Sequence, residues 1–264
     1  MRHLNRYLRL TKPQPAIAAA PSPGLRLCVV IPCLNEPELP TLIERLHGQT
    51  LPDAAVEILI VINHADNAAD AIKAANAETL RSIEDLRARH DALQVHAIRA
   101  FDLPAKDAGV GLARKIGMDE AMRRFAAIGR PDGIIASLDA DCRVSDNYIA
   151  GLIAAFDRDP SMHAATLPFA HRLDEVQDAR HRSAMTLYEL FLRYVELGWR
   201  HAGLPYAFTS IGSCFAVRAN ACARHHGMNK RKAGEDFYFL HKLARERSLG
   251  YIPGVCVYPS ARMS

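Results

Sequence analysis

The stretch that decides the fold is Gly133-Ile134-Ile135-Ala136-Ser137-Leu138-Asp139-Ala140-Asp141. It is an apolar run that follows a Pro-Asp-Gly turn signal and ends on two carboxylates, which predicts a buried strand. Because side chains alternate along a strand, Asp139 and Asp141 point the same way where the strand meets a loop. An isolated Asp-x-Asp is more often a solvated turn. Two carboxylates on one side nevertheless fit Mg²⁺ or Mn²⁺, which bind few carboxylates in proteins.

The bulk composition is that of a globular α/β protein. The chain has 264 residues, 49% of them hydrophobic and 23% charged, which is enough for one large domain with a sizeable core. A net charge of +4 and a pI near 8.8 favour anionic ligands without indicating nucleic acid. The six cysteines show no Cys-x-x-Cys pair, so we expect thiols of a reducing compartment and neither disulfides nor a zinc site.

The two ends of the chain differ from its middle. Residues 1–24 are basic and then rich in Pro and Ala, which predicts an extended arm before a domain over 25–264. We divide this domain into a first half, about 25–160, and a second half, 161–264. No apolar stretch approaches the length of a membrane helix, and no signal-peptide core follows the basic N-terminus. A strand-like segment runs almost to Ser264, so we expect the natural protein to continue beyond it.

Strands and helices alternate along the first half of the sequence. The alternation predicts right-handed βαβ units and a mixed, mostly parallel sheet with helices on both faces. The expected strands are residues 25–31, 56–62, 93–98, 133–138, 164–169 and 208–217. The expected helices are residues 39–46, 68–90, 111–127, 148–156, 183–199 and 236–245.

Polar residues follow three of the expected strands. Asn35 and Glu36 follow the first, residues 63–66 follow the second, and Asp139 and Asp141 follow the strand quoted above. In open α/β sheets ligands bind outside the carboxyl ends of the strands. The three clusters together favour a binding site at this edge more strongly than the acid pair alone.

The order of three motifs resembles the family 2 glycosyltransferases, which have the GT-A fold. The motifs are Val-Val-Ile-Pro-Cys-Leu-Asn-Glu (29–36), Asp-Ala-Asp (139–141) and Gly-Glu-Asp-Phe (234–237). The resemblance covers about residues 25–258. It implies a single GT-A-like domain and a hexosyltransferase-type enzyme of class EC 2.4. Its first half (about 25–160) would bind the nucleotide sugar, and its second half (161–264) would bind the acceptor.

The resemblance also implies which residues hold the donor. The turn after the first strand, with Pro32, Asn35 and Glu36, would contact the nucleotide base. Asn63 and His64 stand where the family usually has acidic residues that contact base or ribose.

A glycine-containing turn and helix start, with Gly109 and Arg114, is similar to the family's Ala-Arg-Asn segment. Glycine lets a backbone approach a ligand, and a helix N-terminus attracts anions. Gly109 and its neighbours could equally make an ordinary tight loop. Lys115 departs from the usual Asn.

The remaining roles concern metal and chemistry. The resemblance implies that Asp139 bridges ribose and metal, that Asp141 binds Mn²⁺ or Mg²⁺, and that Asp236 is the general base of an inverting transfer. Acids in a first helical turn are also commonplace, and Glu235 is the less favoured alternative base. Gly212, Ser213 and Trp199 are weaker candidates for acceptor contacts. Trp199 belongs to an aromatic stripe at helical spacing, and such a stripe is more often part of the core.

The predicted partners are a UDP- or GDP-type sugar donor and a hydroxyl-bearing acceptor, with no nucleic acid. We expect a cytoplasmic protein without a transmembrane segment, and contact with the inner face of a membrane stays open. One alternative is a non-catalytic sugar-nucleotide binding module. Another is an Asp-x-Asp phosphohydrolase, which Arg143 disfavours because Thr or Val is expected at that position.

Overall fold

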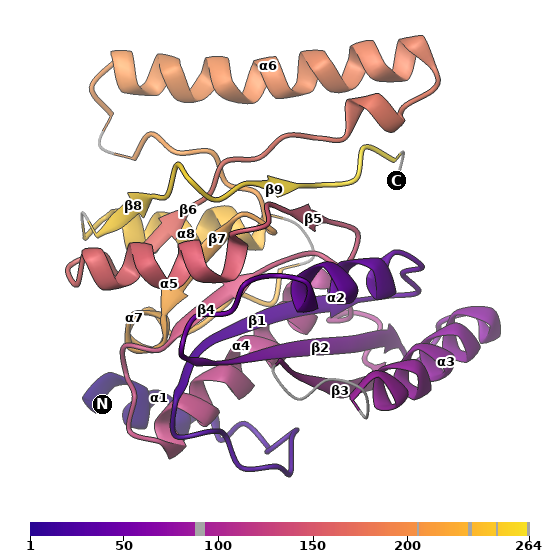
Figure 1. Cartoon of the computed structure of the whole chain (residues 1–264), viewed down its shortest axis with the longest axis vertical. Helices are drawn as coiled ribbons and strands as arrows, with labels where there is room; N and C mark the ends of the chain where they lie inside the picture. The colour runs from indigo at the N-terminus through magenta and orange to yellow at the C-terminus, as the bar shows by residue number, and fades with distance from the viewer. Residues whose placement is uncertain (88–92, 205, 232–233, 247, 263–264) are drawn as a thin grey trace.

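The computed structural model describes residues 1–87, 93–204, 206–231, 234–246 and 248–262. Within them a seven-stranded sheet has the order β3-β2-β1-β4-β7-β6-β8, and β5 pairs with β9 in a two-stranded sheet (Figure 1). The strands are β1 (Leu25–Cys33), β2 (Ala55–Ala65), β3 (Gln94–Leu103), β4 (Ile134–Ser137), β5 (Arg143–Val144), β6 (Ala164–Thr166), β7 (Phe215–Arg218), β8 (Leu249–Tyr251) and β9 (Val257–Tyr258).

The pairing confirms a mixed, mainly parallel sheet. Strand β1 pairs in parallel with β2 and β4, and β2 pairs in parallel with β3. Strand β7 lies antiparallel between β4 and β6, and β8 is parallel to β6. The carboxyl ends of β1, β2 and β4 therefore meet at one edge of the sheet, which is where ligands bind in such folds.

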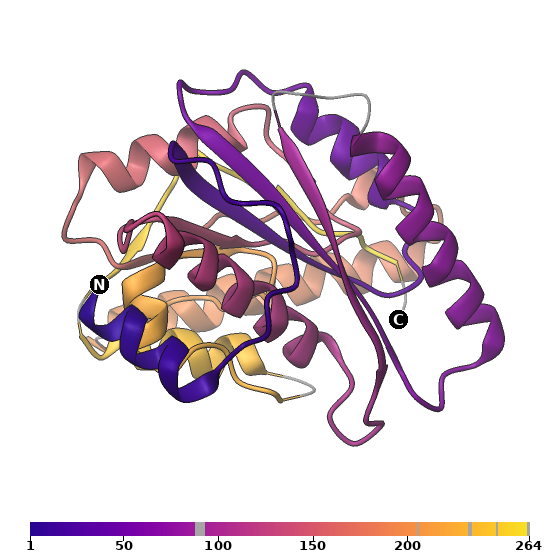
Figure 2. The ribbon, with the colours of Figure 1, turned by 90° about the horizontal axis from the view of Figure 1, so that it is seen from below.

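Helices cover both faces of the sheet, as predicted (Figures 1 and 2). One hydrophobic cluster joins the sheet to α2, α3 and α5, and a second joins it to α1, α4, α7 and α8. The helices are α1 (Arg2–Thr11), α2 (Leu39–His47), α3 (Asp70–Arg87), α4 (Val110–Ala127), α5 (Tyr148–Arg158), α6 (Ala179–His201), α7 (Ala219–Arg224) and α8 (Glu235–Ala244), with a 3₁₀ turn η1 (Leu173–Glu175).

Strand β1 shows why the two layers form. Val29 and Ile31 belong to the first cluster, while Cys28 and Val30 belong to the second, so successive side chains enter opposite cores. A strand buried on both faces has a continuous apolar sequence, which is typical of parallel sheets between helices.

Two features differ from the sequence-based expectations, and a third lies partly outside the described residues. Residues 2–11 of the arm form a helix that packs on the domain through Leu4 and Tyr7, whereas residues 12–24 have no regular structure. The strand expected at 208–217 is wrong over 208–214, because only Phe215–Arg218 pairs with neighbouring strands. The helix expected at 68–90 is present as α3, and its last three residues lie outside the described ranges.

The six cysteines are free thiols, five of them buried. Among the described residues, no helix is both long enough and apolar enough to cross a membrane.

Candidate active site

Arg114 joins the two acidic motifs. It lies near the N-terminal end of α4 with 1% of its surface exposed, and its guanidinium donates from Nη2 to Oδ1 of Asp139 and from Nη1 to Oε1 of Glu235. Burial disfavours the charged guanidinium, but the charges of Asp139, Glu235 and Asp236 outweigh this effect and raise the pKa of Arg114. The Asp-x-Asp and Glu-Asp motifs, far apart in sequence, therefore share one permanent positive charge.

Glycines allow the chain to close around this arginine. Gly109 caps the N-terminus of α4 with a φ of +154°, a conformation that side-chain-bearing residues rarely adopt. A Cβ atom on Gly212 would lie 2.6 Å from Nη2 of Arg114, so a larger residue in the loop before β7 would push the guanidinium away from its carboxylate partners. Ser137, the last residue of β4, donates from Oγ to the carbonyl of Gly212 at 2.7 Å and fixes this loop. The neighbouring Ser213 is buried, 1% exposed.

Asp141 lies in a second charged group beside the first. Arg262 forms a bidentate ion pair with Glu36, and its Nη2 is 3.5 Å from Oδ2 of Asp141. Burial raises the pKa of Asp141, the charge of Asp139 adds to this effect, and Arg262 opposes it. The residues after β9 thus return to the carboxyl ends of β1 and β4.

Arg172 and Arg262 are site residues that the sequence analysis missed. Arg172 is buried. Its Nη2 donates to the carbonyl oxygen of Asp141 at 3.0 Å, and its Nη1 donates to Oε2 of Glu38 at 2.9 Å. Neither arginine stands in a recognisable motif. Arg262 could have been suspected only if the pairing of β9 with β5, directly after Asp141, had been known.

The predicted nucleotide contacts at the ends of β1 and β2 are linked through Asn76 of α3. The Asn76 side chain accepts from the backbone N–H of Asn35 at 2.9 Å and donates to the carbonyl of Asn63 at 2.9 Å. Asn63 is buried and donates to the carbonyl of Cys33 at 3.0 Å. Asn35 itself is exposed with a φ of +48°. The side chain of Asn63 therefore shapes the turn that presents Asn35.

His64 is buried between protein groups. Its Nδ1 lies 3.1 Å from Nδ2 of Asn76, its Nε2 lies 3.5 Å from Oδ1 of Asp102, and its ring stacks on Phe101 with centroids 4.3 Å apart. Both ring nitrogens of His64 therefore face protein groups. Its role in donor binding stays a prediction.

The first-strand turn borders a hollow. Pro32 is buried within β1, opposite Val61 of β2. Beyond it, Asn35 and Glu36 line a pocket of about 370 Å³ between α2 and α3. Its volume is within the range of small-ligand sites.

Asp236 and Lys115 have different partners in the structure. Asp236 is half-buried in the first turn of α8, and its Oδ1 accepts from the backbone N–H of Phe237 at 2.8 Å. Lys115, the departure from the family's Asn, donates to the hydroxyl of Tyr7 at 2.6 Å and forms an ion pair with Asp119 at 2.9 Å. Lys115 thus holds α1 against α4 and leaves Arg114 as the cation of this helix start.

Comparison with known families identifies the chain. The model of glycosyl transferase family 2 matches residues 28–224. The chain belongs to this family. A search of curated proteins finds no match.

Solved structures show the GT-A fold for this family 2 member. S. aureus TarS in complex with UDP-GlcNAc is 15% identical with a TM-score of 0.62, and the alignment covers 91% of this chain and 60% of TarS. A mannosyltransferase from Pyrobaculum calidifontis, in complex with GDP-Man and Mn²⁺, is 17% identical with a TM-score of 0.52, covering 95% and 62% of the two chains. The chain therefore spans less than two thirds of the length of these structures.

The two carboxylates of the Asp-x-Asp motif are compatible with a hard cation. Asp139 and Asp141 are partly exposed, with side-chain exposures of 35% and 24%, and the charge of Asp139 helps to raise the pKa of Asp141. Among the described residues no cluster of three or more Asp, Glu, His or Cys could hold a metal. Mg²⁺ and Mn²⁺ need few protein ligands when phosphate and water complete the shell, so two carboxylates are compatible with such an ion.

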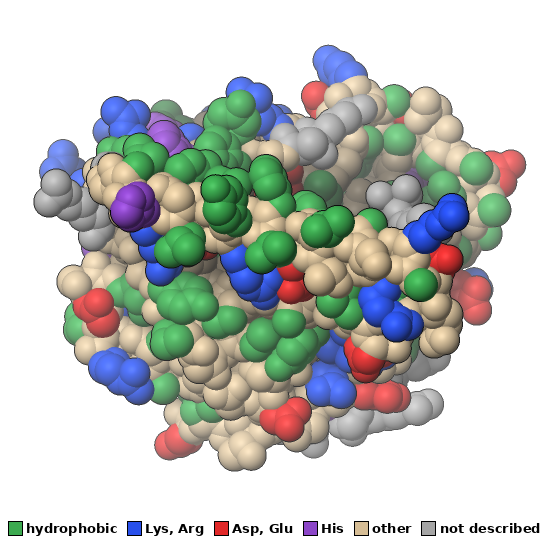
Figure 3. Space-filling model, turned by 90° about the horizontal axis from the view of Figure 1, so that it is seen from above, with side chains coloured by type: hydrophobic (Ala, Val, Ile, Leu, Met, Phe, Trp, Pro, Cys, Tyr) green, Lys and Arg blue, Asp and Glu red, His purple; other side chains and the backbone are tan. Residues whose placement is uncertain are grey.

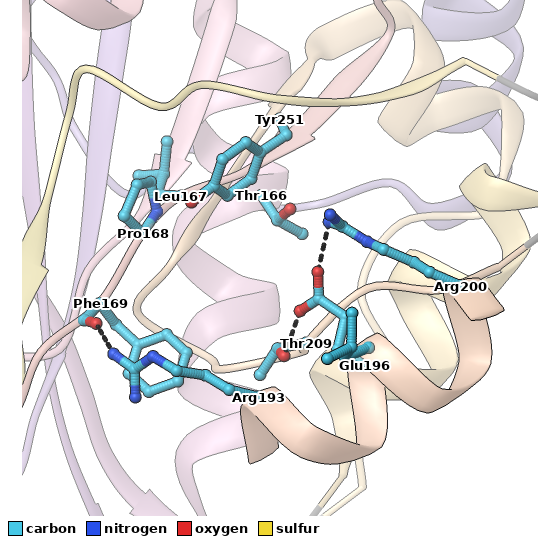
Figure 4. A pocket seen from close by; sticks show the side chains of 10 residues that line it. Thr166, Leu167, Pro168, Phe169, Arg193, Glu196, Arg200, Thr209 and Tyr251 are labelled. Carbon is cyan, nitrogen blue, oxygen red and sulfur yellow. Dashed lines mark hydrogen bonds and ion pairs between the residues drawn. The ribbon is translucent and has the colours of Figure 1, made fainter. Parts of the chain in front are cut away.

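A separate pocket of about 310 Å³ lies between α6 and the edge of the sheet (Figure 4). On the α6 side of the pocket Glu196 pairs with Arg200. Across the pocket Glu196 accepts from Thr209, and Arg193 donates to the carbonyl of Phe169 at 2.9 Å. None of the residues that line it is a predicted site residue. Trp199 lies half-buried on α6, and its acceptor role stays a prediction.

Proposed function

We propose that this family 2 protein transfers a hexose with inversion from a UDP- or GDP-type sugar donor to a hydroxyl-bearing acceptor, with Asp236 as the general base. The observation that carries the proposal is the fork of Arg114, which binds Asp139 of one acidic motif and Glu235 of the other. This contact brings Asp236 to the same edge as Asp139. The ligands named for TarS and the mannosyltransferase support a nucleotide-sugar donor.

The two acids of the Glu-Asp motif have different surroundings. Glu235 is 4% exposed and held by Arg114, so it fixes the start of α8. Asp236 is more accessible and has a backbone donor on one oxygen. Asp236 is therefore the better base, and Glu235 positions it.

The base step follows from this arrangement. The Asp236 carboxylate takes the proton of the acceptor hydroxyl while that oxygen attacks the anomeric carbon. The bond to the donor diphosphate breaks as the new bond forms, so the configuration inverts. General-base catalysis of this kind contributes about 10²- to 10⁴-fold in rate.

The other charged residues would bind and orient the donor. Asp141 and Asp139 would hold Mn²⁺ or Mg²⁺, which when bound neutralises charge on the leaving diphosphate. Arg114 keeps the Asp139 carboxylate in one orientation. Glu36 and Asn35 would contact the nucleotide base. We place the protein on the cytoplasmic side, where nucleotide sugars are available.

The test is release of sugar from UDP-GlcNAc and GDP-mannose with water as acceptor. Asp236→Asn should lower turnover at least about a hundredfold while donor binding by calorimetry is kept. Asp174→Asn, at an exposed aspartate of η1, serves as the matched control and should leave turnover unchanged.

Two results would refute the proposed role. One is near-normal turnover of Asp236→Asn, and the other is a released sugar of retained anomeric configuration by NMR. Donor binding without any turnover of the unaltered chain would instead indicate a binding module.

A further inference from the structure

Helix α6 exposes its large apolar side chains to solvent and directs its glutamates toward the domain. It is 23 residues long, none of its residues is buried, and it lies across the top of the domain in Figure 1. A surface helix normally turns its apolar stripe to the core. The expectation that its aromatic stripe belongs to the core is wrong. The outward-facing large side chains are Leu187 (64% exposed), Tyr188 (47%), Leu190 (60%), Phe191 (61%), Tyr194 (72%) and Leu197 (65%).

The polar bonds of α6 lie on its inner side. Glu189 accepts from the backbone N–H and Nδ1 of His171, and also pairs with Arg193. Glu196 pairs with Arg200 and with Thr209 across the pocket of Figure 4. These bonds fix the rotation of the helix, so its apolar face cannot turn inward without breaking them.

The outward face carries no acid. Glu189 and Glu196 are the only acidic residues of α6, and both point inward. Arg180, His181, Arg182 and His201 lie at the two ends of the helix. Arg193 and Arg200 are paired with Glu189 and Glu196. Figure 3 looks onto this face and shows hydrophobic side chains along the helix, with basic groups and some acidic groups around them.

We propose that the outward face of α6 docks on the surface of an anionic membrane. Apolar and aromatic residues flanked by arginines are what an interfacial helix needs, because the apolar face enters the acyl boundary while the arginines meet lipid phosphates. We name this surface, residues Leu187, Leu190, Phe191, Tyr194 and Leu197 with their flanking arginines, the α6 face.

The charges favour a membrane over a second copy of the chain. In a two-fold symmetric contact the same face meets itself. With the helices antiparallel, Arg180 of one copy would approach Arg200 and His201 of the other, and with the helices parallel, like ends would meet. In both arrangements the basic groups at the helix ends approach one another, and the one glutamate near them, Glu196, is already paired with Arg200 and Thr209.

The chain contains a built-in reporter for this contact. Trp199 is the only tryptophan, and it lies half-buried on α6. Its fluorescence emission should shift to the blue when α6 enters the interface of vesicles that contain 70% phosphatidylcholine and 30% phosphatidylglycerol. Vesicles of phosphatidylcholine alone should give a much weaker shift.

The experiment combines this shift with co-sedimentation. The double variant Leu187→Glu/Phe191→Glu should weaken binding to the anionic vesicles at least about a hundredfold, because two large apolar side chains no longer enter the interface. Arg180→Ala should weaken it about fivefold. Leu10→Glu, on the 67% exposed leucine of α1, is the matched control and should bind like the unaltered chain.

Three outcomes would overturn the proposal. They are no binding to anionic vesicles, equal binding to neutral vesicles, and loss of binding in Leu10→Glu as large as in the double variant. A dimer in analytical ultracentrifugation that the double variant dissociates would assign the α6 face to a second copy instead. Donor binding by calorimetry should be the same in all variants, so this test is separate from that of the glycosyltransferase activity.

Discussion

The two ends of α4 carry the same kind of ion pair in different settings. At the C-terminal end Arg124 binds Glu57 of β2, both side chains are 0% exposed, and Arg124 also donates to the carbonyl of Ala19 at 2.9 Å. At the N-terminal end Arg114 is equally buried, but its partner Asp139 is 35% exposed. A buried arginine alone therefore does not mark a site. The site is where the partner carboxylate reaches solvent.

Strand direction explains the difference. Glu57 lies near the start of β2, whereas Asp139 follows the end of β4. The starts of the parallel strands are closed by the arm and by α4, while their ends open into loops that carry function. One helix thus anchors the domain at one end and the acids of the site at the other. The predictions below test this division, from the largest expected effect to the smallest.

Arg124→Met should lower the free energy of unfolding by about 3–5 kcal/mol, because it leaves the charge of Glu57 buried without a partner. Urea denaturation measures the change. The double variant Arg124→Met/Glu57→Leu should recover most of the loss, since an apolar pair of similar volume needs no countercharge. A loss below about 1 kcal/mol in the single variant would show that the closed end is not an anchor.

Asp141→Ala should abolish the Mn²⁺-dependent tightening of UDP or GDP binding and leave the fold intact. The physical reason is the loss of one of two hard oxygen ligands at the open end. Calorimetry with and without Mn²⁺ gives the result. Asp146→Ala removes a 98% exposed carboxylate nearby in the chain and should keep the metal response. An unchanged response in Asp141→Ala would remove this residue from the metal site.

Arg114→Lys should weaken donor binding about tenfold, because an ammonium group cannot engage Asp139 and Glu235 as a planar fork. The matched variant Arg124→Lys makes the same change at the closed end and should lower stability without altering donor affinity. Equal donor affinities in the two variants would show that Arg114 has no more influence on donor binding than Arg124.

Tyr7→Phe should cost about 1–2 kcal/mol of unfolding free energy, because the buried hydroxyl donates to Asp119 at 2.7 Å and accepts from Lys115. Thermal or urea unfolding measures it, with turnover expected to stay unchanged. A change in turnover larger than the change in stability would mean that α1 also acts on the site.

The sequence predicts the first half of the fold well because its strands are continuous apolar runs that alternate with longer helical stretches. The bounds of β1, β2, α4 and α5 agree with expectation to within about three residues. The second half is less predictable. Residues 208–214 have strand-like composition but no strand partner, since the loop there folds over Arg114.

The site shows the same limit. Asp139, Glu235 and Arg114 were named from motifs, and the structure brings them together. Arg172 and Arg262 were missed because an arginine in a loop has no periodicity or spacing that announces its partner. Asn63 and His64 were named for the donor, and their side chains also bond to protein groups.

By itself the sequence determined the βαβ order, the acids at the strand ends and the family, because these depend on local hydrophobic pattern and short motifs. Only the tertiary structure decided that Arg114 is shared by two motifs, that Arg262 returns to Glu36, and that the apolar face of α6 points outward. These three features depend on contacts between residues far apart in the chain. Hydrophobic periodicity shows that a helix has two faces but not which face the rest of the protein covers.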